Sequence, residues 1–401
     1  MGSYGYGNLG DELMLEGVLA GLRRTLPYAR ITVLSGDSEQ TSRLHNVRSI
    51  EWGGGTLARL RRYWEYVQSD LLVVGGGNLR DNLTRDNSSR FNVLAIWLDQ
   101  VLMAHEIGVP TMCYAVSIGH VTTPEGGLAL KNCLEKVDAI SVREPESAAK
   151  VLEFGVSREV VVAADAAFSA IPQPRHSKTR KGVALFLRHW YERGNYTENS
   201  EVFDSMIGEI AAYCDAFVER YHEPIWMVPF KATGSDADND TYIHQELYGR
   251  MQQRKDVKVL DRVPDMETLM SIFASARFVI GMRLHSLIIA TALGTPWVSV
   301  NYDPKVRAFA RYAGQDRFSL DVSEVTSHRL SELEKVLITN EGDISTTLGS
   351  VSEGFRTMER RNAEIARDIL VRTPTVICPE KTVVRSARLW RYRFSRRQKK
   401  G

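Results

Sequence analysis

The 401-residue chain has few cysteines and no long apolar run. Its cysteines, Cys113, Cys133, Cys214 and Cys378, lack the Cys-x-x-Cys spacing of a zinc site and the dense pattern of a disulfide framework, which fits a reducing compartment. No stretch of about 20 consecutive apolar residues occurs, the length that spans a bilayer, and no charged start followed by an apolar segment opens the chain. We therefore expect a cytoplasmic protein without a membrane-spanning helix, a metal site or disulfides.

The net charge is also small, +2 from 51 basic and 49 acidic residues, so the overall balance predicts no specific nucleic-acid partner. The charge is unevenly distributed, because Arg385–Lys400 contains many basic residues interleaved with Trp390, Tyr392 and Phe394 and no acidic residue. Anionic lipid head groups attract such a segment by about 1 kcal/mol for each basic residue. Its apolar residues do not form one helical face. We expect loose peripheral attachment to the inner face of the membrane; a solvated tail, or one that binds nucleic acid nonspecifically, is the alternative.

The length exceeds that of a usual single core, so two domains are expected. Strand-like and helix-like segments alternate in both halves, which indicates parallel, doubly wound sheets. We predict an α/β fold of two Rossmann-like domains that face each other across a cleft. The predicted segments are the N-terminal domain 1–171, the linker 172–181, the C-terminal domain 182–350, a helix over 351–372 and a basic aromatic tail over 373–401.

Two glycine-rich stretches lie in the N-terminal half. Residues 2–12, GSYGYGNLGDE, lead into an expected helix with Asp11 as N-cap, and a run of three glycines at 75–77 follows an expected strand. Such loops bring backbone N–H groups close to a ligand. We predict that this side binds the acceptor, through Gly7, Asn8, Asp11 and Asn78. A loop of the first kind normally follows a strand, and that first strand of the N-terminal domain is absent before Gly2. We expect it upstream of Met1; a sheet that lacks this strand is the alternative.

The stretch 278–307, FVIGMRLHSLIIATALGTPWVSVNYDPKVR, carries the main functional signal. It predicts a buried strand, a tight turn with Arg283 and His285, a helix, a second buried strand, and then Lys305 and Arg307. Ligands of open parallel sheets bind at the carboxyl ends of the strands, where these cations are expected to meet. A histidine among cations suits proton transfer to an anionic substrate.

Several motifs resemble the bacterial polysaccharide pyruvyl transferase family: GSYGYGNLGDE, GGGNLRD, SVRE, ADAAF, MVPF and GMRLHSLIIATALGTPWVSVNYDPKV. The resemblance runs in order from Gly2 to about Phe309. It implies a fold like that of the GT-B glycosyltransferases. It also implies transfer of pyruvate from phosphoenolpyruvate to two hydroxyls of a sugar, which forms a cyclic ketal.

The resemblance also suggests roles for individual residues. Arg283 falls on the family's phosphoenolpyruvate-binding position, His285 on its acid, Lys305 on its catalytic lysine and Arg143 on its arginine after the fifth strand. The chain departs from the family's usual Asp-Pro at Asp165, which alanine follows here.

The chemistry of phosphoenolpyruvate leads to the same residues. A phosphate and a carboxylate require several cations, and arginine gives bidentate contacts, so Arg188 and Arg307 are expected to bind it beside Arg283. The enol carbon must be protonated, which suits an acid with a pKa near 7, and a nearby dianion favours the protonated form of His285. The scheme requires no metal and no cofactor.

Simpler interpretations of these residues remain open. His285 also suits a packing role at a helix start, and Arg143 a structural ion pair with Glu144 or Glu146. Three alternating aspartates lack the glycine and glutamate of a calcium-binding loop, and we interpret them as a solvated acidic loop: Asp236, Asp238 and Asp240.

Two other functions fit the predicted fold. A GT-B glycosyltransferase that uses a nucleotide sugar would share the architecture, although no nucleotide-binding pattern is visible. A non-catalytic carbohydrate-binding or scaffold protein would leave the cations around His285 without a purpose. The preferred partners are phosphoenolpyruvate and a saccharide acceptor of the cell envelope or an exopolysaccharide, free or lipid-linked.

Overall fold

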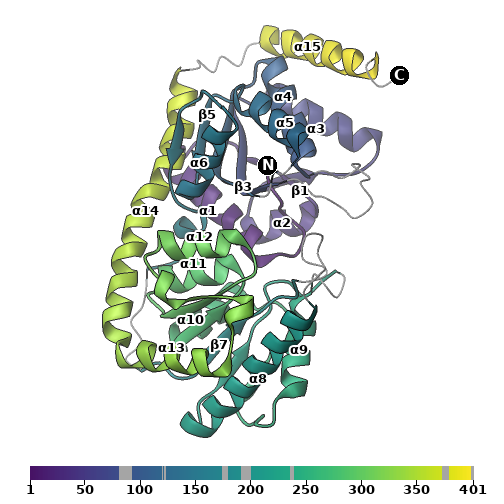
Figure 1. The fold of residues 1–401 in the computed structure, drawn as a ribbon. Coiled ribbons are helices and arrows are strands. Elements are labelled where there is room, and N and C mark those ends of the chain that lie inside the picture. Colours follow the sequence, from purple (N-terminus) through teal and green to yellow (C-terminus); the bar gives the residue numbers. More distant parts are fainter. Residues whose placement is uncertain are drawn as a thin grey trace. The chain divides into compact units, whose positions relative to one another are not determined.

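The chain forms two compact units (Figure 1). Unit 1 comprises Met1–Tyr6, Asp11–Ala170 and Thr357–Gly401, and unit 2 comprises Gly7–Gly10 and Ile171–Arg356. The computed structural model describes residues 1–80, 93–119, 121, 123–173, 179–190, 200–234, 239–372 and 379–398, with side chains for all but 93, 95, 96, 379–381 and 392–398.

Unit 1 is an α/β assembly with two parallel sheets. One sheet pairs β1 (Thr32–Ser35) with β2 (Arg48–Glu51). The other has the order β3 (Leu72–Leu79), β4 (Thr111–Ile118), β5 (Ala139–Val142), β6 (Val160–Val162). The first seven helices are α1 (Leu9–Thr25), whose first two residues belong to unit 2, α2 (Ser38–His45), α3 (Thr56–Gln68), α4 (Val93–Ile107), α5 (Pro124–Leu134), α6 (Pro145–Glu153) and α7 (Ala167–Ala170).

The glycine run 75–77 lies inside β3 rather than after it, which corrects the expected loop. Gly76 and Gly77 have φ of +57° and +138°, conformations that glycine tolerates best. A Cβ on Gly76 would lie 3.0 Å from the Cβ of Met14 in α1, and one on Gly77 would lie 2.8 Å from the ring of Trp97 in α4. These glycines therefore admit helices of the same unit close to the strand.

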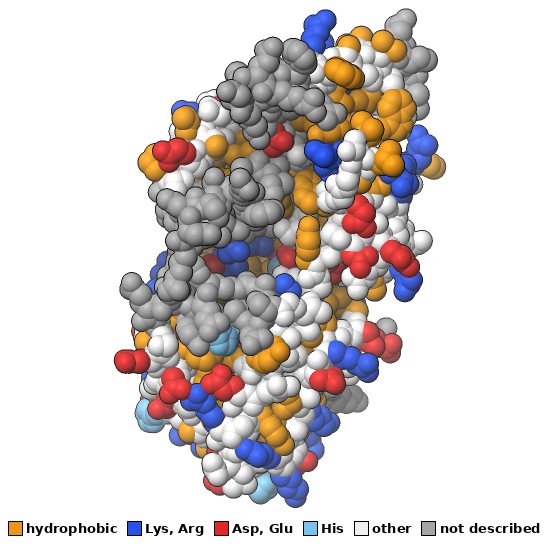
Figure 2. All heavy atoms as spheres, turned by 90° about the vertical axis from the view of Figure 1, so that its right-hand side faces the viewer, with side chains coloured by type: hydrophobic (Ala, Val, Ile, Leu, Met, Phe, Trp, Pro, Cys, Tyr) orange, Lys and Arg blue, Asp and Glu red, His pale blue; other side chains and the backbone are white. Residues whose placement is uncertain are grey.

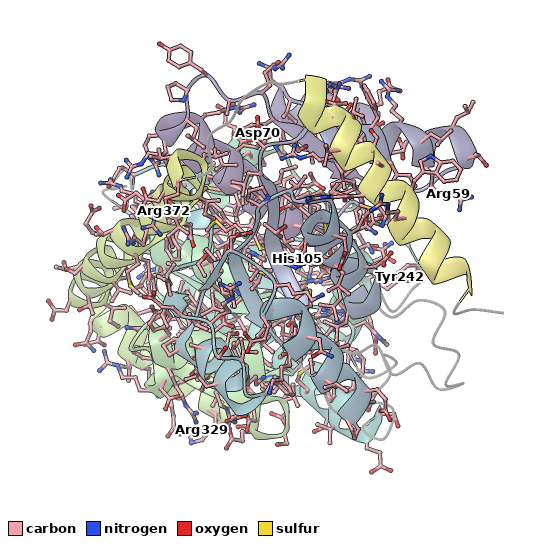
Figure 3. All side chains as sticks on the ribbon, turned by 90° about the horizontal axis from the view of Figure 1, so that it is seen from above. Arg59, Asp70, His105, Tyr242, Arg329 and Arg372 are labelled. Carbon is pink, nitrogen blue, oxygen red and sulfur yellow. The ribbon has the colours of Figure 1, made fainter. Side chains whose placement is uncertain are left out.

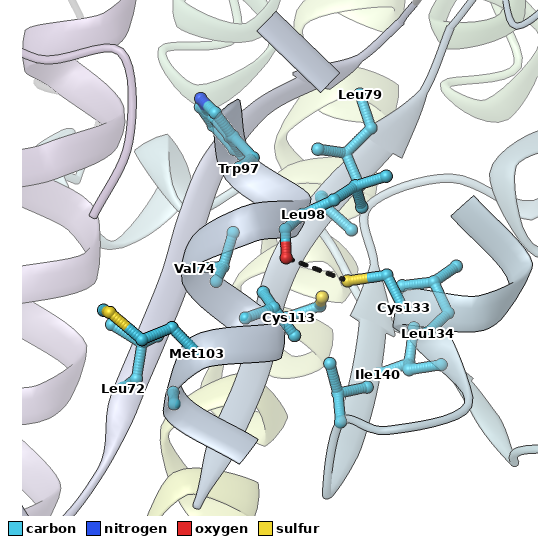
Figure 4. Packing of buried hydrophobic residues seen from close by; sticks show 14 of the residues in the cluster. Leu72, Val74, Leu79, Trp97, Leu98, Met103, Cys113, Cys133, Leu134 and Ile140 are labelled. Carbon is cyan, nitrogen blue, oxygen red and sulfur yellow. Dashed lines mark hydrogen bonds between the residues drawn. The ribbon is translucent and has the colours of Figure 1, made fainter. Parts of the chain in front are cut away.

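The core of unit 1 packs β3, β4 and β5 against α4 and α5 (Figure 4). Cys113 and Cys133 are free thiols within it, and the Cys133 thiol donates to the Leu98 carbonyl at 3.9 Å. Burial raises the pKa of Cys113 to about 12, so this thiol is not a nucleophile at neutral pH.

The N-terminal segment bonds to both sheets of unit 1. The Met1 ammonium donates to the Val73 carbonyl at 2.6 Å, and the Gly36 N–H, just after β1, donates to the Tyr4 carbonyl at 2.9 Å. No strand precedes α1 in the described ranges, and an additional strand before Gly2 stays a prediction.

Unit 2 has one six-stranded parallel sheet, in the order β12-β11-β10-β7-β8-β9. Its strands are β7 (Val183–Phe186), β8 (Ile225–Met227), β9 (Val257–Val259), β10 (Phe278–Gly281), β11 (Trp297–Asn301) and β12 (Ser319–Asp321). The strand order reverses between β7 and β10. That reversal defines the topological switch point, where open α/β sheets bind their ligands.

Helices complete unit 2. They are α8 (Ser200–Tyr221), α9 (Asp240–Arg250), α10 (Met266–Ser275), α11 (Leu284–Ala292), α12 (Pro304–Tyr312) and α13 (Ser327–Thr339), with short 3₁₀ turns η3 (Asp316–Phe318) and η4 (Val322–Glu324). All residues of α11 except His285 are buried, as its apolar composition on every side requires.

The C-terminal region differs from expectation. Helix α14 (Glu341–Arg372) begins well before the expected position 351 and contributes residues to both units. The expected tail contains a helix, α15 (Pro379–Gln398), which contacts α3 and α4. Every helix in the part of the chain that the structure describes is too short or too polar to cross a bilayer.

Candidate functional site

The carboxyl ends of β7 and β10 are joined at the switch point of unit 2. The Met282 N–H donates to the Phe186 carbonyl at 3.0 Å. A Cβ on Gly281 would lie 2.4 Å from Ser286 Oγ, so glycine is required for α11 to begin this close to the strand. Residues that follow the two strands therefore emerge side by side.

Arg188, which follows β7, contacts Tyr302, which follows β11. An Nη of Arg188 donates to the Tyr302 hydroxyl at 3.0 Å, and its Cζ lies 4.9 Å from the centre of the tyrosine ring. Both side chains are buried. The cation of Arg188 thus bonds to a phenol, and its charge remains suited to a bound anion.

Tyr302 is a site residue that the sequence analysis missed. Burial raises its pKa, but the charges of Arg188, Lys305 and Arg283 outweigh burial and the charge of Asp303, so the pKa is lowered to about 8. A tyrosine with such a pKa exchanges its proton near physiological pH. In the sequence, the one signal for Tyr302 is its position in the family motif Tyr-Asp-Pro-Lys, which ends at Lys305.

Lys305 lies beside the same tyrosine. Its Nζ is 5.9 Å from the centre of the Tyr302 ring and 3.7 Å from Oδ2 of Asp303. Asp303 caps α12, because its side chain accepts from the Lys305 N–H at 3.1 Å. The cap fixes the start of the helix and so the place from which Lys305 extends.

Arg283 forms a buried ion pair with Asp240. Its Nε donates to Oδ2 at 3.0 Å, and an Nη bonds to Oδ1. The carboxylate also accepts the N–H of Phe230 at 2.9 Å and that of Lys231 at 3.1 Å. Asp240 is 1% exposed, so its assignment to a solvated loop was wrong; Asp236 and Asp238 lie outside the described residues.

His285 lies in the first turn of α11 against the glycine loop of residues 7–10. A Cβ on Gly10 would lie 2.3 Å from Nδ1 of the imidazole. The Leu9 N–H donates to the Phe230 carbonyl at 2.9 Å, which holds this loop in unit 2. The structure therefore brings part of the predicted acceptor loop to the predicted acid.

A second histidine, His244 on α9, has a different character. It is fully buried, and its Nε2 accepts the Leu187 N–H at 3.3 Å. Burial lowers its pKa to about 4, against a smaller opposing effect of Asp240. His244 is thus neutral at pH 7 and supports the end of β7, which is a structural role.

Arg307 and Arg143 are both engaged with carboxylates. Arg307, partly exposed, pairs with Asp321 at the end of β12. Arg143 belongs to unit 1 and is buried between Glu144, at 3.0 Å, and Asp165, at 2.8 Å. These contacts support a structural role for Arg143, and its predicted catalytic role stays a prediction.

The predicted acceptor residues fall in both units. Gly7, with φ of +69°, and Asn8 belong to unit 2, whereas Asp11 and Asn78 belong to unit 1. Helix α1 begins at Leu9, and Oδ1 of Asn8 accepts the Gly10 N–H at 3.1 Å, so Asn8 takes the capping position expected for Asp11. Acceptor binding by all four stays a prediction.

Solved structures with the same architecture define the class of fold. UDP-GlcNAc 2-epimerase from Neisseria meningitidis matches with a TM-score of 0.59 and 10% identity, over 92% of this chain and 99% of that chain. The epimerase from Methanocaldococcus jannaschii gives 0.58 and 11%, over 88% and 96%. A glycosyltransferase from Rickettsia africae gives 0.56 and 12%, over 92% and 97%. The fold is therefore GT-B-like.

The sequence identifies the family within that class. The model of the polysaccharide pyruvyl transferase family matches residues 8–304, and the chain belongs to this family. The amylovoran biosynthesis protein AmsJ of Erwinia amylovora is 25% identical over 207 residues, 47% of this chain. The matched region spans about half, 48%, of that relative.

Proposed function

We propose that the protein transfers the pyruvyl group of phosphoenolpyruvate to two hydroxyls of a cell-envelope or exopolysaccharide sugar and forms a cyclic ketal. The observation that carries the proposal is the meeting of Arg188, Tyr302 and Lys305 after β7 and β11, on either side of the strand that leads to His285. Membership of the family supports the same reaction.

The charges of the cluster suit the donor. Arg283 is neutralised by Asp240, and Lys305 is partly neutralised by Asp303, but Arg188 bonds to a phenol. While Tyr302 is a neutral phenol, as it is below about pH 8, the cluster therefore has excess positive charge at the sheet edge. A small molecule with a phosphate and a carboxylate matches this arrangement of cations. The same cations stabilise the negative charge of the phosphate as it leaves.

His285 is the proton donor in the proposed reaction. It protonates C3 of phosphoenolpyruvate, which makes C2 electrophilic, and the first sugar hydroxyl adds at C2 and loses its proton. The C2–O bond to phosphate breaks, the second hydroxyl adds at C2, and its proton is also released. One proton is thus consumed at C3, two are released from the hydroxyls, and inorganic phosphate carries away the bonding pair.

Tyr302 takes one of the hydroxyl protons. A base is needed after each addition, and a phenolate held between the charges of Arg188 and Lys305 is available near pH 8. The tyrosine and the histidine then have opposite roles, which their environments support: the phenol is surrounded by cations, and the imidazole faces the substrate dianion.

The alternative is a glycosyltransferase that uses a nucleotide sugar. The structural neighbours favour it, since the epimerase from Neisseria meningitidis is bound to UDP-GlcNAc. Those neighbours share at most 12% identity with this chain, a similarity that concerns the fold. The two functions predict different donors, and binding separates them.

The acceptor is proposed to be carried on a lipid at the inner face of the membrane, and the enzyme to work there as a peripheral protein. Polysaccharide precursors carried in this way would place the sugar beside the bilayer surface. This location requires a surface on the enzyme that attaches to lipid.

Titration calorimetry with phosphoenolpyruvate and with UDP-GlcNAc tests the donor. We expect phosphoenolpyruvate to bind, and Arg188→Gln to weaken it by about tenfold or more, since a charge-assisted contact contributes about 1.5–3 kcal/mol. Arg311→Gln, which removes an exposed arginine of the same unit, is the matched control. Tight binding of UDP-GlcNAc without binding of phosphoenolpyruvate would overturn the proposal.

A further inference from the structure

Helix α15 is attached to unit 1 by specific contacts. Leu389 is buried in the core cluster that includes α4. Arg385 donates to the carbonyls of Val67 at 3.1 Å, Ser69 at 2.9 Å and Gly108 at 3.2 Å. These carbonyls lie at the ends of α3 and α4, where helices leave acceptors unpaired, so Arg385 caps both helices.

The opposite side of α15 exposes large apolar side chains. Val383 is 68% and Trp390 is 75% exposed. Their spacing of seven residues puts them on one face of the helix. In Figure 3 the helix lies between Arg59 of α3 and His105 of α4. The exposed face therefore points away from the core of unit 1.

Helix α3, which contacts α15, also has an exposed apolar face. Leu57, Leu60 and Trp64 are 83%, 51% and 50% exposed and occupy positions i, i+3 and i+7. A helix of a soluble protein normally buries such a stripe. Here the inward side is formed by Tyr66 and Val67, so the stripe is additional to the core.

Both helices also carry exposed arginines. Arg59 and Arg61 are exposed on α3, and Arg388 and Arg391 on α15. The carboxylate of α3, Glu65, is bonded to Arg48. Figure 2 shows hydrophobic and basic side chains together at the upper end of the molecule, where α15 lies. The combination of apolar residues, tryptophan and arginine is typical of surfaces that bind at the bilayer interface.

We propose that the exposed faces of α3 and α15 together form one lipid-binding patch, which attaches unit 1 to an anionic bilayer surface. The patch consists of Leu57, Leu60 and Trp64 on α3 and of Val383 and Trp390 on α15, with the exposed arginines of both helices. Its apolar side chains enter the interface and its arginines meet lipid phosphates. A second copy of the chain is disfavoured as the occupant, because the same positive charges would face each other.

The patch differs from the loose attachment that composition indicates for 385–400. Attachment involves a folded surface, half of which lies on α3, far away in the sequence. The inference goes beyond the proposed reaction, because lipid binding is measured without turnover and its failure would leave the pyruvyl transfer untouched.

Flotation of the full-length protein with vesicles tests the patch. We expect binding to vesicles that contain phosphatidylglycerol, weaker binding as salt is raised, and little binding to phosphatidylcholine alone. The variant Leu57→Gln/Leu60→Gln leaves α15 unchanged and should weaken binding by about tenfold or more, because each leucine loses its apolar burial in the interface.

The matched control is Leu128→Gln/Leu152→Gln, which changes two leucines of α5 and α6 in the same unit that are 61% and 63% exposed. The control should float like the unchanged protein, and thermal unfolding should be the same for both variants. Equal flotation of the α3 variant and the unchanged protein would overturn the patch. Retention on DNA without flotation would instead assign the basic surface to nucleic acid and also overturn it.

Discussion

Gly10 lies so close to His285 that no side chain fits between them: a Cβ at position 10 would be 2.3 Å from Nδ1 of the imidazole. Gly10 has helical conformation at the start of α1, where alanine is intrinsically preferred to glycine. Its absence of a side chain therefore serves the position of the histidine and not the helix.

Gly10→Ala should displace the His285 ring and lower kcat by about tenfold to 10²-fold, because small displacements of a reacting group have large effects on rate. Gly249→Ala is the control, since a Cβ there meets nothing within 4 Å. Steady-state kinetics and a thermal melt check both variants. Unchanged kcat in Gly10→Ala would mean that the contact does not position the acid.

His285→Ala should reduce phosphate release by about 10²-fold or more, the usual size of a general-acid contribution. Phosphoenolpyruvate should still bind, because the arginines that hold it remain. Calorimetry and a phosphate-release assay on the same preparation separate the two effects. Retained turnover with this variant would exclude His285 as the proton donor.

Arg283→Lys should weaken phosphoenolpyruvate binding, because lysine keeps one charge but loses the planar guanidinium that can bond Asp240 and a donor oxygen at the same time. The expected loss of affinity is about tenfold. Calorimetry measures it, with Arg311→Lys as the control on the exposed side of α12. Equal affinity would return Arg283 to a purely structural role as the partner of Asp240.

Tyr302→Phe tests the proposed base through pH dependence. The phenolate is the active form, so kcat/KM of the unchanged enzyme should rise as pH increases through about 8. The variant lacks the phenol and should lose this rise, with kcat lower by about 10²-fold. A pH–rate profile of both proteins tests this assignment. If kcat/KM of the variant rises through the same pH range, the rise belongs to a group other than Tyr302.

His244→Gln tests the neutral buried histidine. Its folded pKa of about 4 lies below the ordinary value of 6.5, so the unfolded state binds more protons between these values and stability is lost as pH falls through this window. The loss from this residue is at most about 3 kcal/mol. Glutamine can still accept the Leu187 N–H, and it should flatten this pH dependence in urea unfolding at pH 7 and pH 4.5. If the free energy of unfolding falls by the same amount between pH 7 and pH 4.5 in both proteins, the assignment of a lowered pKa to His244 is contradicted.

Local sequence signals were sufficient for much of unit 2. The apolar runs of β10 and β11, the glycine at 281 and the helix boundary at 294–296 determine the strand-turn-helix-strand order, and the structure has it. The family resemblance and the GT-B-like fold are confirmed.

Relations between distant residues were not available from local pattern. Tyr302 acquires its lowered pKa from Arg188, 114 residues away in the chain, because the sheet order brings β7 near β11. Asp240 lies in an acidic stretch that looks solvated, and only the fold places it under the N–H groups of Phe230 and Lys231.

The C-terminal helix shows the same limit. The composition of 385–400 predicts only a loose attachment to the membrane surface, whereas the contacts that attach α15 to unit 1 include those of Leu389 and Arg385. Neither residue is distinguishable from its neighbours without the carbonyls and the apolar pocket that receive it. The position of such a basic helix is determined by the folded surface on which it packs, and local sequence does not reveal that surface.

The mass of the product tests the central claim most directly. The purified protein is incubated with phosphoenolpyruvate carrying ¹³C at all three carbons and with cell-envelope oligosaccharides, and phosphate release is followed in parallel. We predict an acceptor heavier by one labelled pyruvate less one water, formed in equal amount to phosphate, and no such product with His285→Ala. Phosphate release without a labelled acceptor, or transfer of a sugar from UDP-GlcNAc under the same conditions, would contradict pyruvyl transfer.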